Sequence, residues 1–311
     1  MIFFGIDSSN YRSSAAALFG DNSFINKRKL LFVENGKRGL RQSDAVFLHT
    51  KQLPLMVTEV MKEIEPLKIK CIGVSSKPRN ALDSYMPCFL SGVSLASVLG
   101  AALKIPVFEF SHQEGHIAAA LLSADRLDLF DKPFIAFHLS GGTTEAILVS
   151  PSNDGGFKTA IVGKTLDINA GQVIDRVGVM LGLDFPSGPA LEQLAEKGSA
   201  KAGIRPCIKG CDCALSGAEN ICQKMLDDGD KYEDIAATAI EYVISTVCKM
   251  ALAVSEKYNN LPFVFSGGVV ANTNLKKRLS EIISANFASP ELSGDNAVGI
   301  ALLAKIKMEK R

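Results

Sequence analysis

Short apolar runs alternate with longer segments of helical spacing along the first part of the chain. Apolar runs bounded by turn residues are typical of strands, and apolar positions three and four residues apart are typical of helices. The predicted strands are Met1–Asp7, Arg12–Phe19, Cys71–Ser75 and Pro106–Phe110, and the predicted helices are Thr50–Ile64, Phe89–Leu103 and Glu114–Ser123. This alternation indicates an α/β fold with a mixed sheet.

The same plan begins again at Pro133. Strand Phe134–Leu139, a small polar turn and strand Glu145–Ser150 repeat the strand, loop and strand that open the chain. We interpret this as a distant internal duplication with two lobes, residues 1–130 and 131–311, and a linker near Leu127–Pro133. The alternative is two unrelated hairpins. The remaining predicted elements are helices Asn169–Leu181, Ala190–Lys197, Ala218–Asp228, Tyr232–Tyr258, Asn274–Ser284 and Asn296–Lys310, and strand Phe263–Phe265. We expect that the last of these helices can pack back on the first lobe.

Composition is that of a globular protein. Hydrophobic residues make up 47% of the 311 positions and charged residues 22%, which excludes a disordered chain. A net charge of +1 gives no global basic field, so a nucleic-acid partner must meet a local patch or other subunits.

The chain opens without a basic region before a cleavable apolar stretch, and we therefore expect a cytoplasmic protein with reduced cysteines. The apolar stretch Phe89–Phe108 contains serines, Lys104 and Pro106, so we expect no membrane span.

Two histidines form the first candidate site. His112 and His116 stand at positions i and i+4, on one face of a predicted helix, and both can reach one metal ion. Glu114 lies third in this run, unlike the glutamate of the zinc-protease motif, so proteolysis is not supported. Such a pair needs a third ligand from elsewhere, and a carboxylate is typical. The alternative is a pair of histidines that bind nothing.

Two glycine-rich loops form the second candidate site. Ser140, Gly141, Gly142, Thr143 and Thr144 offer successive backbone N–H groups and hydroxyls, which is how a chain cradles phosphate oxygens. Ser266, Gly267 and Gly268 end a buried strand and lead towards a helix, whose N-terminus favours negative charge. Each loop alone could be an ordinary turn. Together, with Asp7-Ser8-Ser9 as a third loop, they favour nucleotide binding.

Asp175 is a third candidate. It lies about two turns beyond Asp167 along a predicted helix, where a carboxylate could accept hydrogen bonds from a ribose or another polar substrate. Spacing alone favours the other interpretation, a solvated carboxylate.

These segments together resemble a known family. His112–His116, Leu139–Glu145, Gly163–Pro189, Ser266–Asn272 and Asp295-Asn296 follow the order and spacing of the TsaD/Gcp family. This is the family of tRNA N6-adenosine threonylcarbamoyltransferases, formerly called O-sialoglycoprotein endopeptidases. The resemblance covers nearly the whole chain and implies a duplicated, two-lobe actin-like (ASKHA) ATPase fold with a central nucleotide cleft.

The resemblance also implies ligands and a reaction. The metal would be Fe²⁺ or Zn²⁺, held by His112, His116 and Asp295. The substrate, threonylcarbamoyl-AMP, would contact the Ser140–Thr144 loop, Asp175, Gly188, Gly267, Gly268 and Asn272. The threonylcarbamoyl group would move to N6 of adenosine 37 in tRNAs that read codons beginning with A. Implied partners are tRNA, a smaller TsaB-like paralogue and a TsaE-like ATPase.

Several positions depart from the family pattern. The opening loop ends in Tyr11-Arg12 where the family has an acidic pair, and Lys77-Pro78-Arg79 stands where the family has Gly-Pro-Gly. Glu219 stands where the family has a lysine. Besides an active transferase, the sequence therefore leaves open a catalytically silent paralogue that binds a nucleotide or metal or assists assembly. An ATP-dependent kinase of the same fold is disfavoured, because it needs no imidazole ligands.

Overall fold

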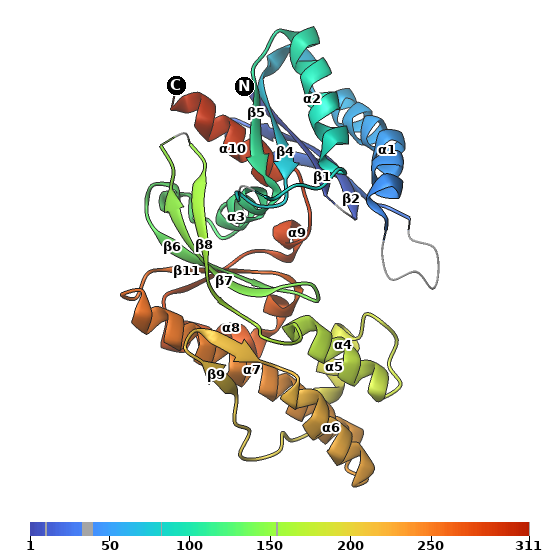
Figure 1. The fold of residues 1–311 in the computed structure, drawn as a ribbon, viewed down its shortest axis with the longest axis vertical. Coiled ribbons are helices and arrows are strands. Elements are labelled where there is room, and N and C mark those ends of the chain that lie inside the picture. Colours follow the sequence, from blue (N-terminus) through green and yellow to red (C-terminus); the bar gives the residue numbers. More distant parts are fainter. Residues whose placement is uncertain (10, 33–39, 82, 154, 311) are drawn as a thin grey trace. The chain divides into compact units, whose positions relative to one another are not determined.

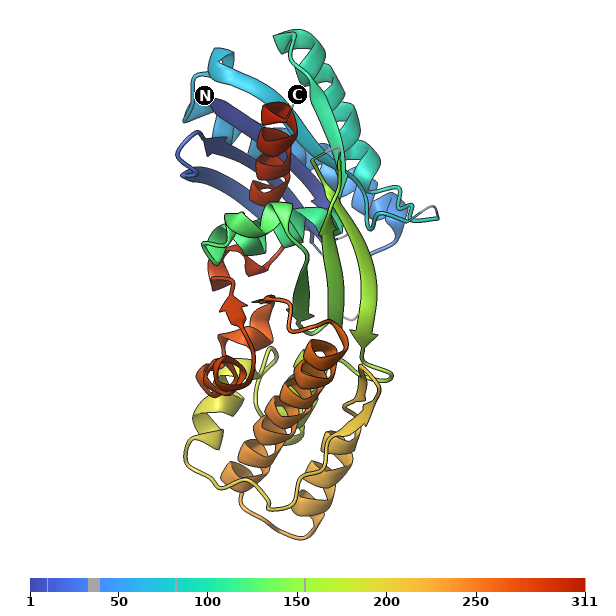
Figure 2. The same ribbon diagram turned by 90° about the vertical axis from the view of Figure 1, so that its left-hand side faces the viewer.

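The structure, a computed structural model, describes residues 1–311 except 10, 33–39, 82, 154 and 311. The described chain forms two compact units (Figures 1 and 2). The first unit comprises 1–131, 150–158 and 291–311, and the second comprises 132–149 and 159–290. Each unit is built around one five-stranded mixed sheet.

The sheet of the first unit has the order β3-β2-β1-β4-β5. Its strands are β1 (Ile2–Ser9), β2 (Arg12–Phe19), β3 (Phe24–Leu30), β4 (Ile69–Lys77) and β5 (Val107–Ser111). Strand β1 pairs antiparallel with β2 and parallel with β4, and β4 pairs parallel with β5. All eight residues of β1 are buried, as expected for a central strand covered on both faces.

Helices cover both faces of this sheet. Helices α1 (Gln42–Lys62) and α2 (Phe89–Leu103) pack on one face, where Ile2, Phe4 and Ile6 point. Helices α3 (His112–Ser123) and α10 (Val298–Glu309) pack together on the other. A Cβ atom on Gly5 of β1 would lie 2.2 Å from the carbonyl oxygen of Ala297, so glycine allows α10 to sit directly on the sheet.

The sheet of the second unit has the order β12-β11-β6-β7-β8. Its strands are β6 (Phe134–Leu139), β7 (Thr144–Pro151), β8 (Phe157–Lys164), β11 (Phe263–Ser266) and β12 (Ala285–Phe287), of which β7 and β8 extend into the first unit. Its helices are α4 (Ala170–Met180), α5 (Gly188–Ala195), α6 (Gly217–Asp227), α7 (Tyr232–Lys257) and α8 (Thr273–Ile282). A short hairpin, β9 (Cys207–Lys209) and β10 (Asp212–Ala214), completes it.

The two sheets share one topology, which confirms the predicted duplicated fold. In each, a central strand pairs antiparallel with the next strand in sequence on one side and parallel with a later strand on the other. The helix predicted at Thr50–Ile64 begins earlier, at Gln42, and β3, β8 and β12 were not predicted. The hairpin strands β9 and β10 were not predicted either, because three-residue strands are too short to give a periodic pattern.

Among the described residues, one helix, α7, is long and apolar enough to cross a membrane by length and composition. In this fold 72% of its most apolar window is buried. It lies among α4, α5, α6 and α8 within the apolar core of the second unit. Its hydrophobicity is therefore accounted for by packing inside the protein.

Candidate functional site

Helix α3 begins immediately after β5, and a capping box fixes that start. The Ser111 hydroxyl accepts a hydrogen bond from the Glu114 backbone N–H, while Glu114 Oε2 accepts one from the Ser111 N–H at 2.8 Å. Such a box satisfies two backbone donors that the first helical turn leaves unpaired. The helix therefore begins at His112, and His112 and His116 lie one turn apart on the same face.

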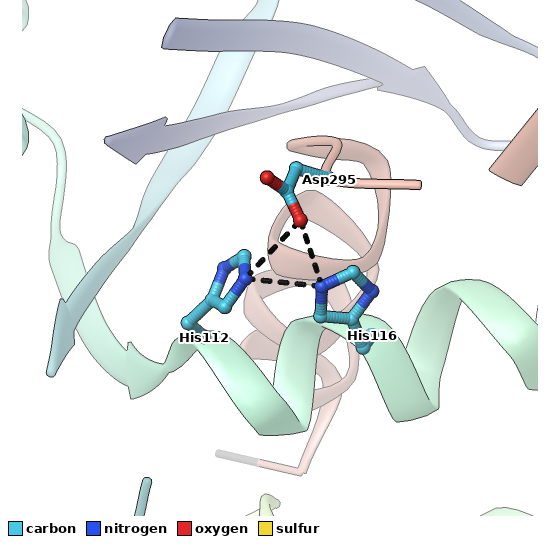
Figure 3. A group of neighbouring side chains, drawn as sticks. All are labelled: His112, His116 and Asp295. Atoms are coloured by element: carbon cyan, nitrogen blue, oxygen red, sulfur yellow. Dashed lines mark hydrogen bonds and ion pairs between the residues drawn. The ribbon is translucent and has the colours of Figure 1, made fainter. Parts of the chain in front are cut away.

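Asp295, in the loop before α10, meets these two histidines (Figure 3). The Nε2 atoms of His112 and His116 are 3.0 Å apart. Asp295 Oδ1 lies 3.5 Å from the first and 3.2 Å from the second. The structure thus brings together three residues that are up to 183 positions apart in the sequence, and all three belong to the first unit.

The spacing of these three atoms fits one metal ion. Ligand atoms about 2.0–2.1 Å from a tetrahedral metal are about 3.3 Å from one another, and the observed separations are 3.0, 3.2 and 3.5 Å. Two neutral imidazoles and one carboxylate also form a donor set that suits zinc and iron. We refer to His112, His116 and Asp295 as the metal triad.

Two further residues support the triad. The buried Asp7 carboxylate accepts a hydrogen bond from His112 Nδ1–H at 2.8 Å, which leaves the Nε2 lone pair directed at the metal position. The Ser9 hydroxyl donates to Asp295 Oδ2 at 3.0 Å. Both residues lie at the carboxyl end of β1, and their supporting role was not predicted. The signal that could have indicated the role of Asp7 is an aspartate at the end of a buried strand.

The charges of this cluster are strongly coupled. Burial by itself would lower the pKa of His112, but the charges and hydrogen bonds of Asp7 and Asp295 raise it to about 10. Burial would likewise raise the pKa of Asp295, but its hydrogen bonds to His112 and His116 hold it well below its usual range. A metal ion that binds here must therefore displace a firmly held proton.

The two predicted glycine loops adjoin each other in the second unit. Gly267 has φ +104°, and a Cβ atom on it would lie 2.2 Å from the carbonyl oxygen of Leu139, the residue before Ser140. In the Ser140–Thr144 loop, the Gly142 and Thr143 N–H groups donate to Ser140 Oγ at 3.3 and 3.1 Å. A bound phosphate would have to replace the serine at those two donors.

Asp175 lies beside the first of these loops. Its Oδ1 accepts a hydrogen bond from the Ser187 N–H at 2.9 Å, next to Gly188 at the start of α5. A cavity of about 760 Å³ is lined by Gly141 and Asp175, together with Gln172, Arg176 and Phe185. Gly141 and Asp175 therefore line one cavity that is large enough for a nucleotide. Gly188 lies outside the lining of this cavity and follows Ser187, which donates to Asp175.

Asn272 lines a different cavity. Its Oδ1 caps α8 by accepting from the Leu275 N–H at 2.8 Å, and its Nδ2 donates to Glu192 at 3.0 Å. The cavity beside it measures about 440 Å³ and includes Glu192 and Lys277. Asn272 thus already has a structural role, separate from the cavity that contains Gly141 and Asp175.

The duplicated fold and the metal triad define a protein of the actin-like ATPase fold class with a candidate metal site. The family model for tRNA N6-adenosine threonylcarbamoyltransferase, TsaD, matches residues 33–302. The chain belongs to this family.

Relatives agree with this assignment, and a solved structure agrees with the fold. The tRNA N6-adenosine threonylcarbamoyltransferase of Methanopyrus kandleri is 26% identical over 97% of this chain and 86% of its own length. That of Syntrophotalea carbinolica is 34% identical, covering 81% and 76%. A ROK family glucokinase from Streptomyces griseus, solved with glucose and AMPPNP, matches the fold with a TM-score of 0.54 at 10% identity, covering 98% and 99%. These names favour a transferase over a silent paralogue.

Proposed function

We propose that the chain transfers the threonylcarbamoyl group from threonylcarbamoyl-AMP to N6 of adenosine 37 in tRNAs that read codons beginning with A. The observation that carries the proposal is the convergence of His112, His116 and Asp295 on one point, in a chain of the TsaD family. In the reaction, a bond forms between N6 and the carbamoyl carbon. The bond between that carbon and the phosphate oxygen breaks, AMP leaves, and N6 releases one of its two protons to solvent.

Residues of the first unit hold the metal in this proposal. His112, His116 and Asp295 are its ligands, Asp7 fixes the His112 tautomer, and Ser9 fixes the Asp295 carboxylate. When bound, Fe²⁺ or Zn²⁺ supplies a Lewis acid that polarises an oxygen of the substrate. Because an exocyclic adenine amine is a weak nucleophile, positioning of the two reactants carries much of the rate.

Residues of the second unit bind the adenylate in this proposal. The Ser140–Thr144 loop, Gly267 and Gly268 approach its phosphate and base, while Asp175 accepts hydrogen bonds from the ribose beside Gly188. Support comes from the contact between the two loops and from the cavity that Gly141 and Asp175 share. Asn272, which lines a separate cavity and donates to Glu192, is not part of this adenylate site.

We further propose a cytoplasmic protein, with no membrane association, that works with a smaller TsaB-like paralogue and a TsaE-like ATPase. Support for a shared task comes from relatives that join two activities in one chain. The Methanocaldococcus jannaschii relative is named a probable bifunctional tRNA threonylcarbamoyladenosine biosynthesis protein, and this chain spans 55% of its length.

The reaction is tested by reconstitution. The full-length chain, loaded with Fe²⁺ or Zn²⁺, is incubated with threonylcarbamoyl-AMP and an unmodified tRNA that reads an ANN codon, with the two partner proteins added in parallel. Nucleoside analysis should detect threonylcarbamoyladenosine with the wild type and not with His112→Ala. If no preparation yields the modified nucleoside, while a TsaD protein of known activity does so under the same conditions, the proposal is wrong.

A further inference from the structure

We infer that four cations beside the metal triad bind the phosphate backbone of the RNA acceptor. Arg12, Arg28, Lys77 and Arg79 make up this group, which we call the cation row. The inference rests on the proposed function for the identity of the polyanion as RNA. The positions of the cations come from the structure of the first unit alone.

All four cations lie at one edge of the first sheet. Strands β1, β3, β4 and β5 run in the same direction, so their carboxyl ends meet where antiparallel β2 begins. Arg12 opens β2, Arg28 lies near the end of β3, and Lys77 ends β4. Ligands of open α/β sheets bind at this edge, and the metal triad, reached from the end of β5, lies there too.

Arg12 and Arg28 flank the triad on its Asp295 side. Arg12 Nη1 donates to the backbone carbonyl of Asp295 at 3.4 Å. A Cβ atom on Gly294 would lie 3.2 Å from Arg12 Nη1 and 3.8 Å from Arg28 Nη1. Both guanidinium groups therefore lie against the residue that precedes a metal ligand.

Lys77 and Arg79 flank the triad on its histidine side. Lys77 is the register partner of Ser111, the residue that caps α3. The carbonyl of Pro78, between the two cations, accepts a hydrogen bond from the Gln113 N–H at 3.0 Å. This segment is therefore fixed to the helical turn that carries His112.

A chain of phosphates fits this arrangement better than one phosphate does. Arg28 lies on β3 and Lys77 on β4, and these strands are three strand spacings apart, which is about 14 Å at about 4.8 Å per spacing. The carboxyl end of β1, with Asp7 and Ser9, lies between them. A charge-assisted hydrogen bond to phosphate spans only about 2.8 Å. The net charge of +1 gives the chain no global basic field, so an RNA has to meet a local group of cations such as this one.

The charge of these residues also affects how strongly an RNA is bound. Four cations around one edge of the sheet raise the positive potential that an RNA meets there. Such charge strengthens binding through release of counterions from the RNA.

The test measures binding of a labelled anticodon stem-loop RNA to the full-length chain at several salt concentrations, with AMP as a second ligand. The double variant Arg28→Ala/Arg79→Ala removes two cations of the row and keeps Arg12, which donates to the Asp295 carbonyl. Lys68→Ala/Lys70→Ala removes the same charge at the opposite end of β4 and serves as the control. Metal content and thermal unfolding are measured for every variant to verify folding.

We expect the Arg28→Ala/Arg79→Ala variant to bind RNA at least about ten-fold more weakly than the control. The slope of log affinity against log salt should fall by about 0.7 to 0.9 for each cation removed, and AMP affinity should not change. An RNA affinity and slope equal to those of the control would overturn the inference, as would a wild type that fails to bind RNA at low salt. A loss confined to AMP would also overturn it, since the cations would then serve a nucleotide. Because no transfer is measured, failure of the proposed reaction leaves this result intact.

Discussion

The hydrogen bond from His112 to Asp7 makes a quantitative prediction about metal affinity. Asp7→Ala removes a buried carboxylate that accepts from His112 Nδ1–H at 2.8 Å, and with it the group that fixes the imidazole's tautomer and orientation. Loss of such a partner weakens metal binding about 10- to 100-fold. That range corresponds to about 1.4 to 2.8 kcal/mol, which agrees with about 1.5 to 3 kcal/mol for a hydrogen bond to a charged group.

Asp7→Asn should have a smaller effect, because an amide oxygen can still accept the hydrogen bond while the charge is lost. In the metal-free protein Asp7→Asn should also lower the free energy of unfolding, because the buried Asp7 charge stabilises the protonated form of His112. The two variants together separate the effect of orientation from that of charge.

The assay is a competition between the purified chain and a chelating dye for Zn²⁺ at fixed pH. Asp131→Asn is the matched control, because Asp131 pairs with Lys310 at an exposed site. The expected order of affinity is wild type and Asp131→Asn, then Asp7→Asn, then Asp7→Ala. If Asp7→Ala bound zinc as tightly as the wild type, the argument that this carboxylate orients His112 would be refuted.

Three other predictions concern stability, pH and nucleotide binding. Gly267→Ala should lower the free energy of unfolding in urea by about 3 kcal/mol, because φ is +104° and the new methyl group meets a backbone carbonyl. Gly268→Ala is the control: its Cβ would lie in open space, so the free energy of unfolding should change by less than about 0.5 kcal/mol. Burial lowers the pKa of His49, so the unfolded chain binds a proton more readily. The unfolding free energy of the metal-free protein should therefore fall from pH 6.5 to pH 5 by at most about 1.4 kcal/mol per pH unit. A shallower fall in His49→Gln would show that His49 is the titrating group. A pH profile that is unchanged in this variant would contradict that conclusion. Asp175→Ala should weaken AMP binding, measured by calorimetry, about ten-fold. Glu219→Ala is the control, because Glu219 lines the same cavity. An equal loss of affinity in the control would show that the effect is not specific to the ribose contact.

Sequence patterns predicted the regular elements well and the supporting contacts poorly. Helix Phe89–Leu103 and strand Arg12–Phe19 have their predicted bounds, because apolar periodicity and clear turn residues mark both. All residues of strand β3 are half-exposed or exposed, and lysine and arginine are frequent among them. The alternation of apolar and polar positions that marks a strand is therefore weak in this segment. The edge strand β12 has three residues and gives no pattern at all.

The same contrast holds for the candidate site. The spacing of His112 and His116 indicates a shared face of one helix, since that relation is local. Asp295 came only from the family resemblance, because no local pattern connects residues so far apart. The contact of Asp7 with His112 depends on the order of strands in the sheet, which the sequence alone does not determine.

The position of α10 has a consequence for how the protein is made on the ribosome. The first unit is completed by residues 291–311, which are synthesised after every residue of the second unit. Until then one face of the first sheet lacks the helix that seats on Gly5, and Asp295 has not yet joined the histidines. Domains usually fold in the order of their synthesis. Here the first unit is begun first and completed last, so His112, His116 and Asp295 come together only late in translation.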